Sequence, residues 1–130
     1  MPLADAVLIH SYTRAHAIRD GGLIDVTTHA KDAGFRVPVA LTAAVWGDCV
    51  AWDNHHQPVH QDESGRLWDL LTMARHALCS HVKRRGDRTT FTLLRIPRGE
   101  KRPLPVRLAM QIGPGDQGEP VVTIMQPEED

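Results

Sequence analysis

Apolar residues recur at every second position along residues 104–112, and this alternation constrains the fold more than any other feature of the sequence. The apolar positions are Leu104, Val106, Leu108, Met110 and Ile112, and those between them are Pro105, Arg107, Ala109 and Gln111. A period of two residues places successive side chains on opposite faces of a strand. The pattern therefore predicts a strand with one face against a core.

Two further segments of strand-forming composition flank this one. Residues 89–96 are rich in β-branched and aromatic side chains, and residues 120–126 form a second run of such residues. The connections between the three segments are short, so neighbouring strands are expected to run antiparallel. We therefore expect a C-terminal three-stranded antiparallel meander over about 89–96, 104–112 and 120–126.

Helical spacing appears in two segments before the meander. Apolar residues recur every three or four positions over about 39–52 and again over about 64–82. The stripe of the first segment consists of Leu41, Val45, Cys49 and Trp52. We expect an α+β fold in which these two main helices pack on the meander, after a short mixed N-terminal segment. The 130 residues, of which 42% are hydrophobic and 24% charged, are expected to form one domain over residues 1–130.

The cysteines and the apolar runs bear on the compartment. Cys49 and Cys79 lie in the expected helices without a CxxC neighbour, so we expect reduced thiols, with a Cys49–Cys79 disulfide as the alternative. No apolar run reaches the ~18 residues of a membrane span, and the N-terminal residues lack the pattern of a signal peptide. We expect a cytoplasmic protein with no membrane partner.

The net charge of −1 conceals three blocks of alternating sign, of which the first, residues 1–82, carries six Lys and Arg against nine Asp and Glu. Residues 83–112 carry nine Lys and Arg against two Asp and Glu, whereas residues 113–130 carry five acids and no Lys or Arg. A basic block of this kind predicts contacts with nucleic-acid phosphates. The candidate residues are Arg84, Arg85, Arg88, Arg98, Lys101 and Arg102. The alternative is a solvated face that the acidic C-terminal strand and tail neutralise within the meander.

Histidines and acids gather in a polar segment between the two expected helices. They are His55, His56, His60, Asp62 and Glu63. Imidazole and carboxylate groups are ligands for zinc and similar ions, so one hypothesis is a metal-dependent enzyme centred here. The alternative is a solvated loop whose acids favour the start of the following helix. Apart from a divalent metal in this hypothesis, no cofactor is expected.

Two other kinds of residue are candidates for a site. Cys49 follows Asp48 and is a candidate nucleophile, although a buried helical thiol is the common alternative. The three tryptophans, Trp46, Trp52 and Trp68, are core residues or anchors for a protein partner. No motif diagnostic of catalysis is present, and no residue is assigned a catalytic role.

Four blocks of the sequence resemble a known family. They are residues 12–26 (YTRAHAIRDGGLIDV), 39–42 with 45–50 (VALT, VWGDCV), 61–69 (QDESGRLWD) and 112–124 (IGPGDQGEPVVTI). The chain resembles a family of uncharacterised bacterial proteins carried on plasmids, integrative elements and phage-like regions. The resemblance implies an accessory role on a mobile genetic element, for example inhibition of host defence, assistance in transfer or modulation of a partner.

The leading hypothesis from the sequence is therefore a non-enzymatic binding protein that acts through protein–protein contacts. Its partner is expected to be a protein, with homodimer formation as a further expectation. The nucleic-acid-binding module and the metal-dependent enzyme described above are the two alternatives.

Overall fold

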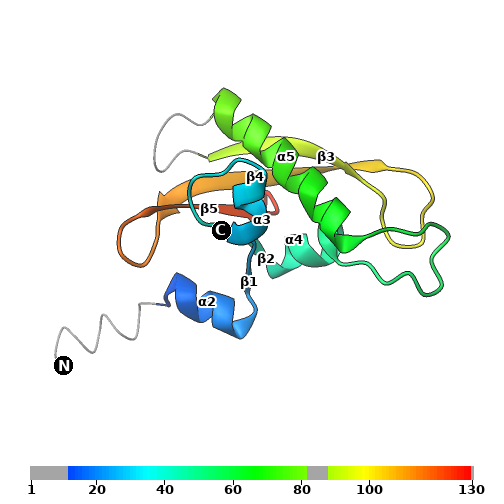
Figure 1. The fold of residues 1–130 in the computed structure, drawn as a ribbon, viewed down its shortest axis with the longest axis horizontal. Coiled ribbons are helices and arrows are strands. Elements are labelled where there is room, and N and C mark those ends of the chain that lie inside the picture. Colours follow the sequence, from blue (N-terminus) through cyan, green and yellow to red (C-terminus); the bar gives the residue numbers. More distant parts are fainter. Residues whose placement is uncertain (1–11, 82–87, 130) are drawn as a thin grey trace.

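A sheet of five strands forms the centre of the protein (Figure 1). The computed structural model describes residues 12–81 and 88–129. The strands are β1 (Leu23–Asp25), β2 (Val39–Thr42), β3 (Arg88–Arg95), β4 (Leu104–Pro114) and β5 (Pro120–Met125). Their order across the sheet is β1-β2-β5-β4-β3, so β1 and β3 are the edge strands. β2 and β5 run parallel, and the other neighbours run antiparallel.

The prediction of a fold built on a C-terminal three-stranded antiparallel meander is wrong. The segments 89–96, 104–112 and 120–126 correspond to β3, β4 and β5, but these strands form three-fifths of a larger mixed sheet. β2 pairs with the free side of β5 in register Val39↔Val122, and β1 pairs with β2. The N-terminal half therefore extends the sheet, and the class of the fold remains α+β.

The prediction of a helix over 39–52 is also wrong. Its first residues form β2, which is followed by the short helix α4 (Ala43–Val45) and the π-helix η1 (Trp46–Val50). Val39, Ala40 and Leu41 are fully buried. Burial on both faces removes the alternation of apolar and polar residues that identifies a strand, so periodicity alone cannot separate such a segment from a buried helix.

The remaining helices lie on both sides of the sheet. The long helix α5 (Glu63–His81), which corresponds to the helix expected at 64–82, packs on β3, on η1 and on α3 (Thr27–Asp32) (Figure 1). The short helix α2 (Arg14–Asp20) packs beside β1 instead. Its first turn is held by Asp116, whose carboxylate accepts hydrogen bonds from the main-chain nitrogens of Arg14 and Ala15 at 2.7 and 3.0 Å.

The core lies between α5 and one face of the sheet. Its largest fully buried side chains include Leu41, Leu70, Leu71, Leu93, Leu108, Met110 and Ile124. Where β3 ends at Arg95, the segment before α5 and the connection from β3 to β4 lie close to η1. The candidate site forms at this end of the sheet. Within the described residues, no helix combines the length and the apolar character needed to cross a membrane.

Candidate functional site

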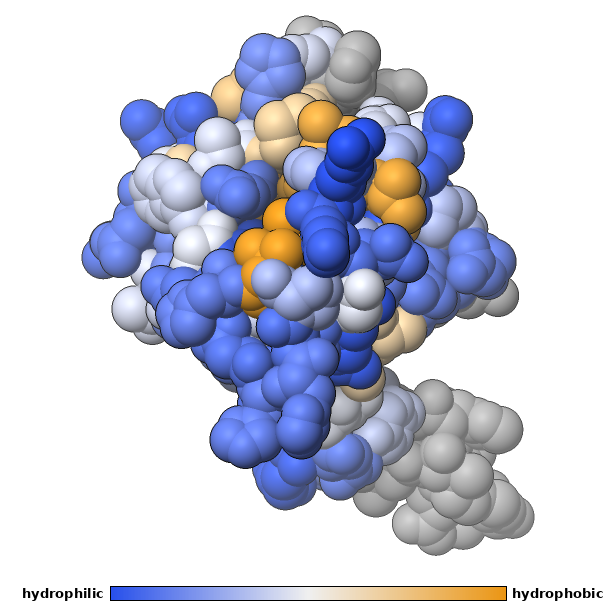
Figure 2. Space-filling view, turned by 90° about the vertical axis from the view of Figure 1, so that its right-hand side faces the viewer, coloured by the Kyte–Doolittle hydropathy of each residue, from blue (hydrophilic) through white to orange (hydrophobic). Residues whose placement is uncertain are grey.

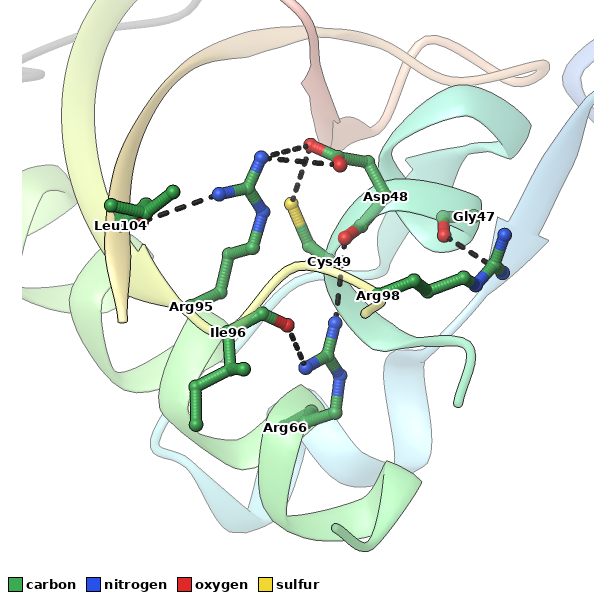
Figure 3. A network of polar contacts seen from close by, with 8 residues as sticks. All are labelled: Gly47, Asp48, Cys49, Arg66, Arg95, Ile96, Arg98 and Leu104. Atoms are coloured by element: carbon green, nitrogen blue, oxygen red, sulfur yellow. Dashed lines mark hydrogen bonds and ion pairs between the residues drawn. The ribbon is translucent and has the colours of Figure 1, made fainter. Parts of the chain in front are cut away.

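Arg66 is a buried charged residue at the centre of a polar cluster (Figure 3). It lies in the first turns of α5, is only 6% exposed, and its guanidinium stacks on the ring of Trp52 at 4.6 Å. Its three nitrogens donate to main-chain oxygens: Nε to Val50 at 3.1 Å, Nη1 to Ile96 at 2.8 Å and Nη2 to Asp48 at 3.4 Å. Arg66 therefore joins α5, η1 and the segment after β3.

The π-helix η1 explains why an arginine is needed at this position. The main-chain nitrogen of Ala51 donates to the oxygen of Trp46 at 2.8 Å, so the turn is one residue wider than an α-helical turn. The last carbonyls of a helix lack partners within it, and positive charge is favourable beside them. Arg66 supplies donors to two of these carbonyls, those of Asp48 and Val50. Short π-helical turns occur frequently at functional sites.

Two further arginines approach η1 from the end of β3. Arg95 donates from Nη2 to both oxygens of Asp48, at 3.2 and 3.1 Å, and from Nη1 to the oxygen of Leu104 at 3.3 Å. Arg98 donates to the oxygen of Gly47 at 3.2 Å. Asp48 therefore has one arginine as an ion-pair partner, while the guanidinium groups of the other two are bound by main-chain oxygens.

Burial changes the acidity of the groups in this cluster. It is the main cause that lowers the pKa of Arg66, while Arg95 and Arg98 lower it further and Asp48 opposes them. Burial also raises the pKa of the Cys49 thiol to about 12, and the adjacent Asp48 carboxylate acts in the same direction. The arginines favour the thiolate but do not outweigh these effects. Cys49 is thus a protonated core thiol at neutral pH, not an activated nucleophile.

A cavity of about 140 Å³ lies against this cluster. It is lined by residues of η1, the segment before α5, α5 itself, the end of β3 and the connection to β4, including Cys49, Gln61, Arg66, Leu93, Arg95 and Pro103. Two buried nitrogens of these side chains, Nε2 of Gln61 and Nε of Arg95, have no hydrogen-bond partner among residues 12–81 and 88–129. Buried donors are nearly always paired in folded proteins, so two unpaired donors at one cavity point to a missing acceptor.

A groove continues from the cavity between α5 and β3. Its volume is about 280 Å³, and it is lined by Asp69, Thr72 and Met73 of α5 and by residues 92–94 of β3. Leu94 is 64% exposed and Met73 is 41% exposed. At the end of the molecule that carries the β3–β4 connection, Figure 2 shows hydrophobic side chains standing among hydrophilic ones.

The histidines and acids of the metal hypothesis are not brought together. His55, His56 and His60 are exposed. The Glu63 carboxylate accepts from the main-chain nitrogen of Trp52 at 2.8 Å, and the Asp62 carboxylate accepts from that of Ser64 at 3.2 Å. Across residues 12–81 and 88–129, no group of three or more His, Cys, Asp or Glu residues is placed to hold a metal ion. Asp62 thus caps the start of α5, whereas Glu63 ties that start to the chain at Trp52.

The basic residues of the nucleic-acid hypothesis are dispersed. Arg84 and Arg85 lie outside the described residues. Arg88, at the start of β3, donates to the main-chain oxygens of Pro127 and Glu129, while Arg98 lies beyond the other end of that strand. Lys101 and Arg102 are exposed in the β3–β4 connection. The acidic tail meets Arg88 through its main chain, so the expected neutralisation by carboxylates is absent from these contacts. Nucleic-acid binding remains a prediction.

The three tryptophans occupy different environments. Trp52 is buried under Arg66 and donates from Nε1 to Asn54 at 2.9 Å. Trp46 is half-buried and packs against the core. Trp68 is 49% exposed on α5. Of the three, Trp68 has the exposure that a partner anchor needs.

The family of the chain follows from a match over nearly its whole length. The model described as "Family of unknown function (DUF6573)" matches residues 2–130. The chain belongs to this family. No curated protein and no solved structure matches the DUF6573 chain. The resemblance to an uncharacterised family is confirmed, whereas the setting on mobile elements stays a prediction. Membership of DUF6573 supplies no activity.

One member of the arginine cluster of this DUF6573 protein is recognisable from the sequence. Arg66 lies four residues before Leu70 and eight before Ala74, so it falls on the apolar stripe of α5. A charged residue on a buried stripe is unusual and marks a position with a special partner. Gln61, Asp48 and Arg95 carry no comparable signal, because only the folded chain places them together.

Proposed function

We propose that this protein is a non-enzymatic binding protein that holds an extended segment of a partner protein in the groove between α5 and β3. The observation that carries the proposal is the position of an apolar groove along an edge strand. In the described part of the chain, β3 pairs with β4 on one side only. An unpaired strand edge offers main-chain donors and acceptors to an added strand, and neighbouring pockets select its side chains.

Exposed apolar side chains support this function. Leu94 of β3 and Met73 of α5 line the groove, and Trp68 stands one turn before Thr72 on the same helix. Large exposed apolar residues beside a groove are typical of binding hot spots. The protonated state of Cys49 also favours binding over thiol chemistry, because the one nucleophile suggested by the sequence is inactive at neutral pH.

The charge of β3 favours a different protein over a second copy of this chain. The strand contains Arg88 near one end and Arg95 at the other, and it contains no acid. In an antiparallel pair of two β3 strands, the two arginines of one copy would face those of the other. Like charges directly opposite destabilise a sheet. The complementary occupant is an extended segment with Asp or Glu flanking its apolar residues. The accessory role on a mobile element, including inhibition of host defence, belongs to this proposal as the setting in which such a partner would be met.

Selection from a random peptide library displayed on phage tests the proposal. The expected result is a consensus of alternating apolar residues flanked by acids, with binding of the synthetic peptide measured by calorimetry. Leu94→Ser and Met73→Ser are each expected to weaken binding about tenfold or more. Tyr12→Ser is the matched control, because Tyr12 is 65% exposed but lies beside α2, and it should change binding less than twofold.

Three results would overturn this function. They are the absence of any enriched peptide, equal binding by the groove variants and the wild type, and a concentration-dependent dimer that Leu94→Ser abolishes. The last result, measured by sedimentation, would assign the groove to a second copy of the chain. Thermal denaturation of each variant verifies that the substitution leaves the fold intact.

A further inference from the structure

The cavity beside Arg66 and the groove along β3 form one continuous surface. Asp69, Leu93 and Leu94 line both of them. The groove is apolar, whereas the cavity adds the polar groups of Gln61, Arg66 and Arg95 to apolar walls that include Ile96 and Pro103. A segment lying along β3 therefore reaches this cavity, called the chamber below, at the Arg95 end of the groove.

The chamber presents donors without acceptors. Nε2 of Gln61 and Nε of Arg95 are buried and unpaired, although both other nitrogens of Arg95 are bound, one to Asp48 and one to Leu104. Asp48 is occupied by Arg95 and lies within 3.7 Å of the Cys49 thiol. The unpaired donors thus lack an acceptor among the described residues, and a group that accepts two hydrogen bonds would complete them.

The charge of the chamber specifies the kind of acceptor. Its charged lining residues are Arg66, Arg95 and Asp69, which leaves one positive charge, and the nearby Asp48 and Arg98 add one charge of each sign. A single carboxylate neutralises this charge and accepts hydrogen bonds at both oxygens, whereas a phosphate dianion exceeds it. Charge-assisted hydrogen bonds of arginine to carboxylate are among the stronger polar contacts in proteins.

We infer that the chamber receives the side-chain carboxylate of a glutamate in the partner segment. This inference rests on the proposed function and names the residue that the groove selects. The apolar walls formed by Leu93, Leu94 and Pro103 suit the methylene stem, and Gln61 and Arg95 donate to the carboxylate. A side chain can enter from a segment running in either direction along β3, so the inference does not depend on strand polarity.

Proton–nitrogen NMR tests the chamber without any peptide. The probe is N-acetyl-glutamate N-methylamide, titrated into the full chain labelled with ¹⁵N, and the matched control is the corresponding glutamine derivative. The expected result is a saturable shift of the Arg95 Nε–H and Gln61 side-chain amide resonances with the glutamate probe alone. Equal responses to both probes, or no response to either, would show a chamber that holds water only and would overturn the inference.

A double-mutant cycle tests the same contact in a peptide obtained from the library. Replacement of its glutamate by glutamine is expected to weaken binding to the wild type about tenfold or more, because a charged hydrogen-bond partner is lost. In Gln61→Met the same replacement is expected to cost at most about threefold. Gln61 bonds Asn54 through main-chain atoms, so this substitution preserves the local structure.

The outcomes separate this inference from the proposed function. Peptide binding that depends on Leu94 but is unchanged by glutamine would preserve the groove and overturn the glutamate contact. An amidated C terminus that weakens binding while glutamine does not would assign the chamber to a terminal carboxylate, which also overturns it. A specific NMR response in a protein that binds no peptide would support the chamber and overturn the groove.

Discussion

Two arginines at opposite parts of the molecule, Arg14 and Arg66, differ in how their charge is balanced. Burial is the first cause that lowers the pKa of each. Around Arg14 the charged neighbours are three acids, Asp25, Asp116 and Glu119, all of which oppose this shift. Around Arg66 the neighbours act in both directions: Cys49 and Asp48 oppose the shift, whereas Arg95 and Arg98 reinforce it.

This difference separates an arginine whose charge is neutralised by nearby acids from one that lies in a region of excess positive charge. Arg14 donates to Thr123 and to the oxygen of Val122, at 2.7 and 2.8 Å. Its positive charge is balanced by the three acids named above. Arg66 is satisfied in hydrogen bonds, but the three arginines of the cluster outnumber its one aspartate, Asp48. Structural arginines are expected to be neutralised locally, because an unbalanced buried charge is costly. The excess charge near Arg66 therefore points to a function outside the fold.

The largest expected effect is on the reactivity of the Cys49 thiol. Its rate of modification shows whether the excess positive charge activates this neighbouring group. With a pKa of about 12 against an ordinary value of 9.0, its thiolate fraction at pH 8 is lowered about a thousandfold. Iodoacetamide should therefore modify exposed Cys79 and leave Cys49 unreacted in the native protein. Peptide mapping after a timed reaction measures this, with 6 M urea as the control in which both thiols react. Comparable native rates would show that the arginines do activate Cys49.

Replacement of Arg66 should cause the largest loss of stability. Arg66→Met removes the donors to three main-chain oxygens, those of Asp48, Val50 and Ile96, and is expected to lower the free energy of unfolding by about 3 kcal/mol. Urea denaturation measures the change. The matched control is Arg75→Met on the same helix, where one bond to Gly34 at an exposed site is lost and about 0.5 kcal/mol is expected. Equal losses would remove the distinction between the two positions.

Replacement of Arg14 is expected to cost less. Arg14→Met removes two donated hydrogen bonds at a half-buried position and leaves the nearby acids without their cation. We expect a loss of about 1–2 kcal/mol by urea denaturation. High salt should reduce this loss by screening the acids, whereas the loss for Arg66→Met should be nearly independent of salt. The same salt dependence for both variants would contradict the comparison.

The smallest expected effect is a pH dependence at α2. Hydrogen bonds from the main-chain nitrogens of Ala15 and Arg14 lower the pKa of Asp116 below its ordinary value. The contribution of this carboxylate is therefore present above the unfolded pKa and is lost as the pH falls through the lower folded pKa. The protection factors of the Arg14 and Ala15 amides, which correct the exchange rate for its intrinsic pH dependence, should fall over that acidic interval. Asp116→Asn should weaken protection at neutral pH and remove the acid-dependent change, and an unchanged pH profile in this variant would refute the assignment.

The predictions from sequence failed where burial removes a periodic signal. The sequence predicts α5, β3 and β4 through the spacing or composition of their apolar residues. β5 is buried on both faces and is predicted by its β-branched composition alone. The sequence predicts a helix where β2 lies, since Val39, Ala40 and Leu41 are buried on both faces and carry no alternation. That error also hid the mixed sheet, because the parallel partner of β2 is β5, more than 80 residues later in the sequence.

The site was less predictable than the strands. The histidine and basic candidates were chosen because they cluster in sequence, yet the described members are exposed or engaged with separate parts of the main chain. Asp48 and Arg95 are 47 positions apart and meet only through the folding of η1 against the end of β3. No local pattern could have joined them.

The sequence by itself determined the long amphipathic helix, the three C-terminal strands and the asymmetry of charge, because each depends on residues that are close together in the sequence. The tertiary structure alone decided that β2 enters the centre of the sheet, that Arg66 meets the carbonyls of η1, and that the charge near Arg95 remains unbalanced beside a groove. The physical reason is that hydrophobic periodicity acts over a few residues, whereas the pairing of strands and the balance of buried charges depend on segments brought together by the whole fold.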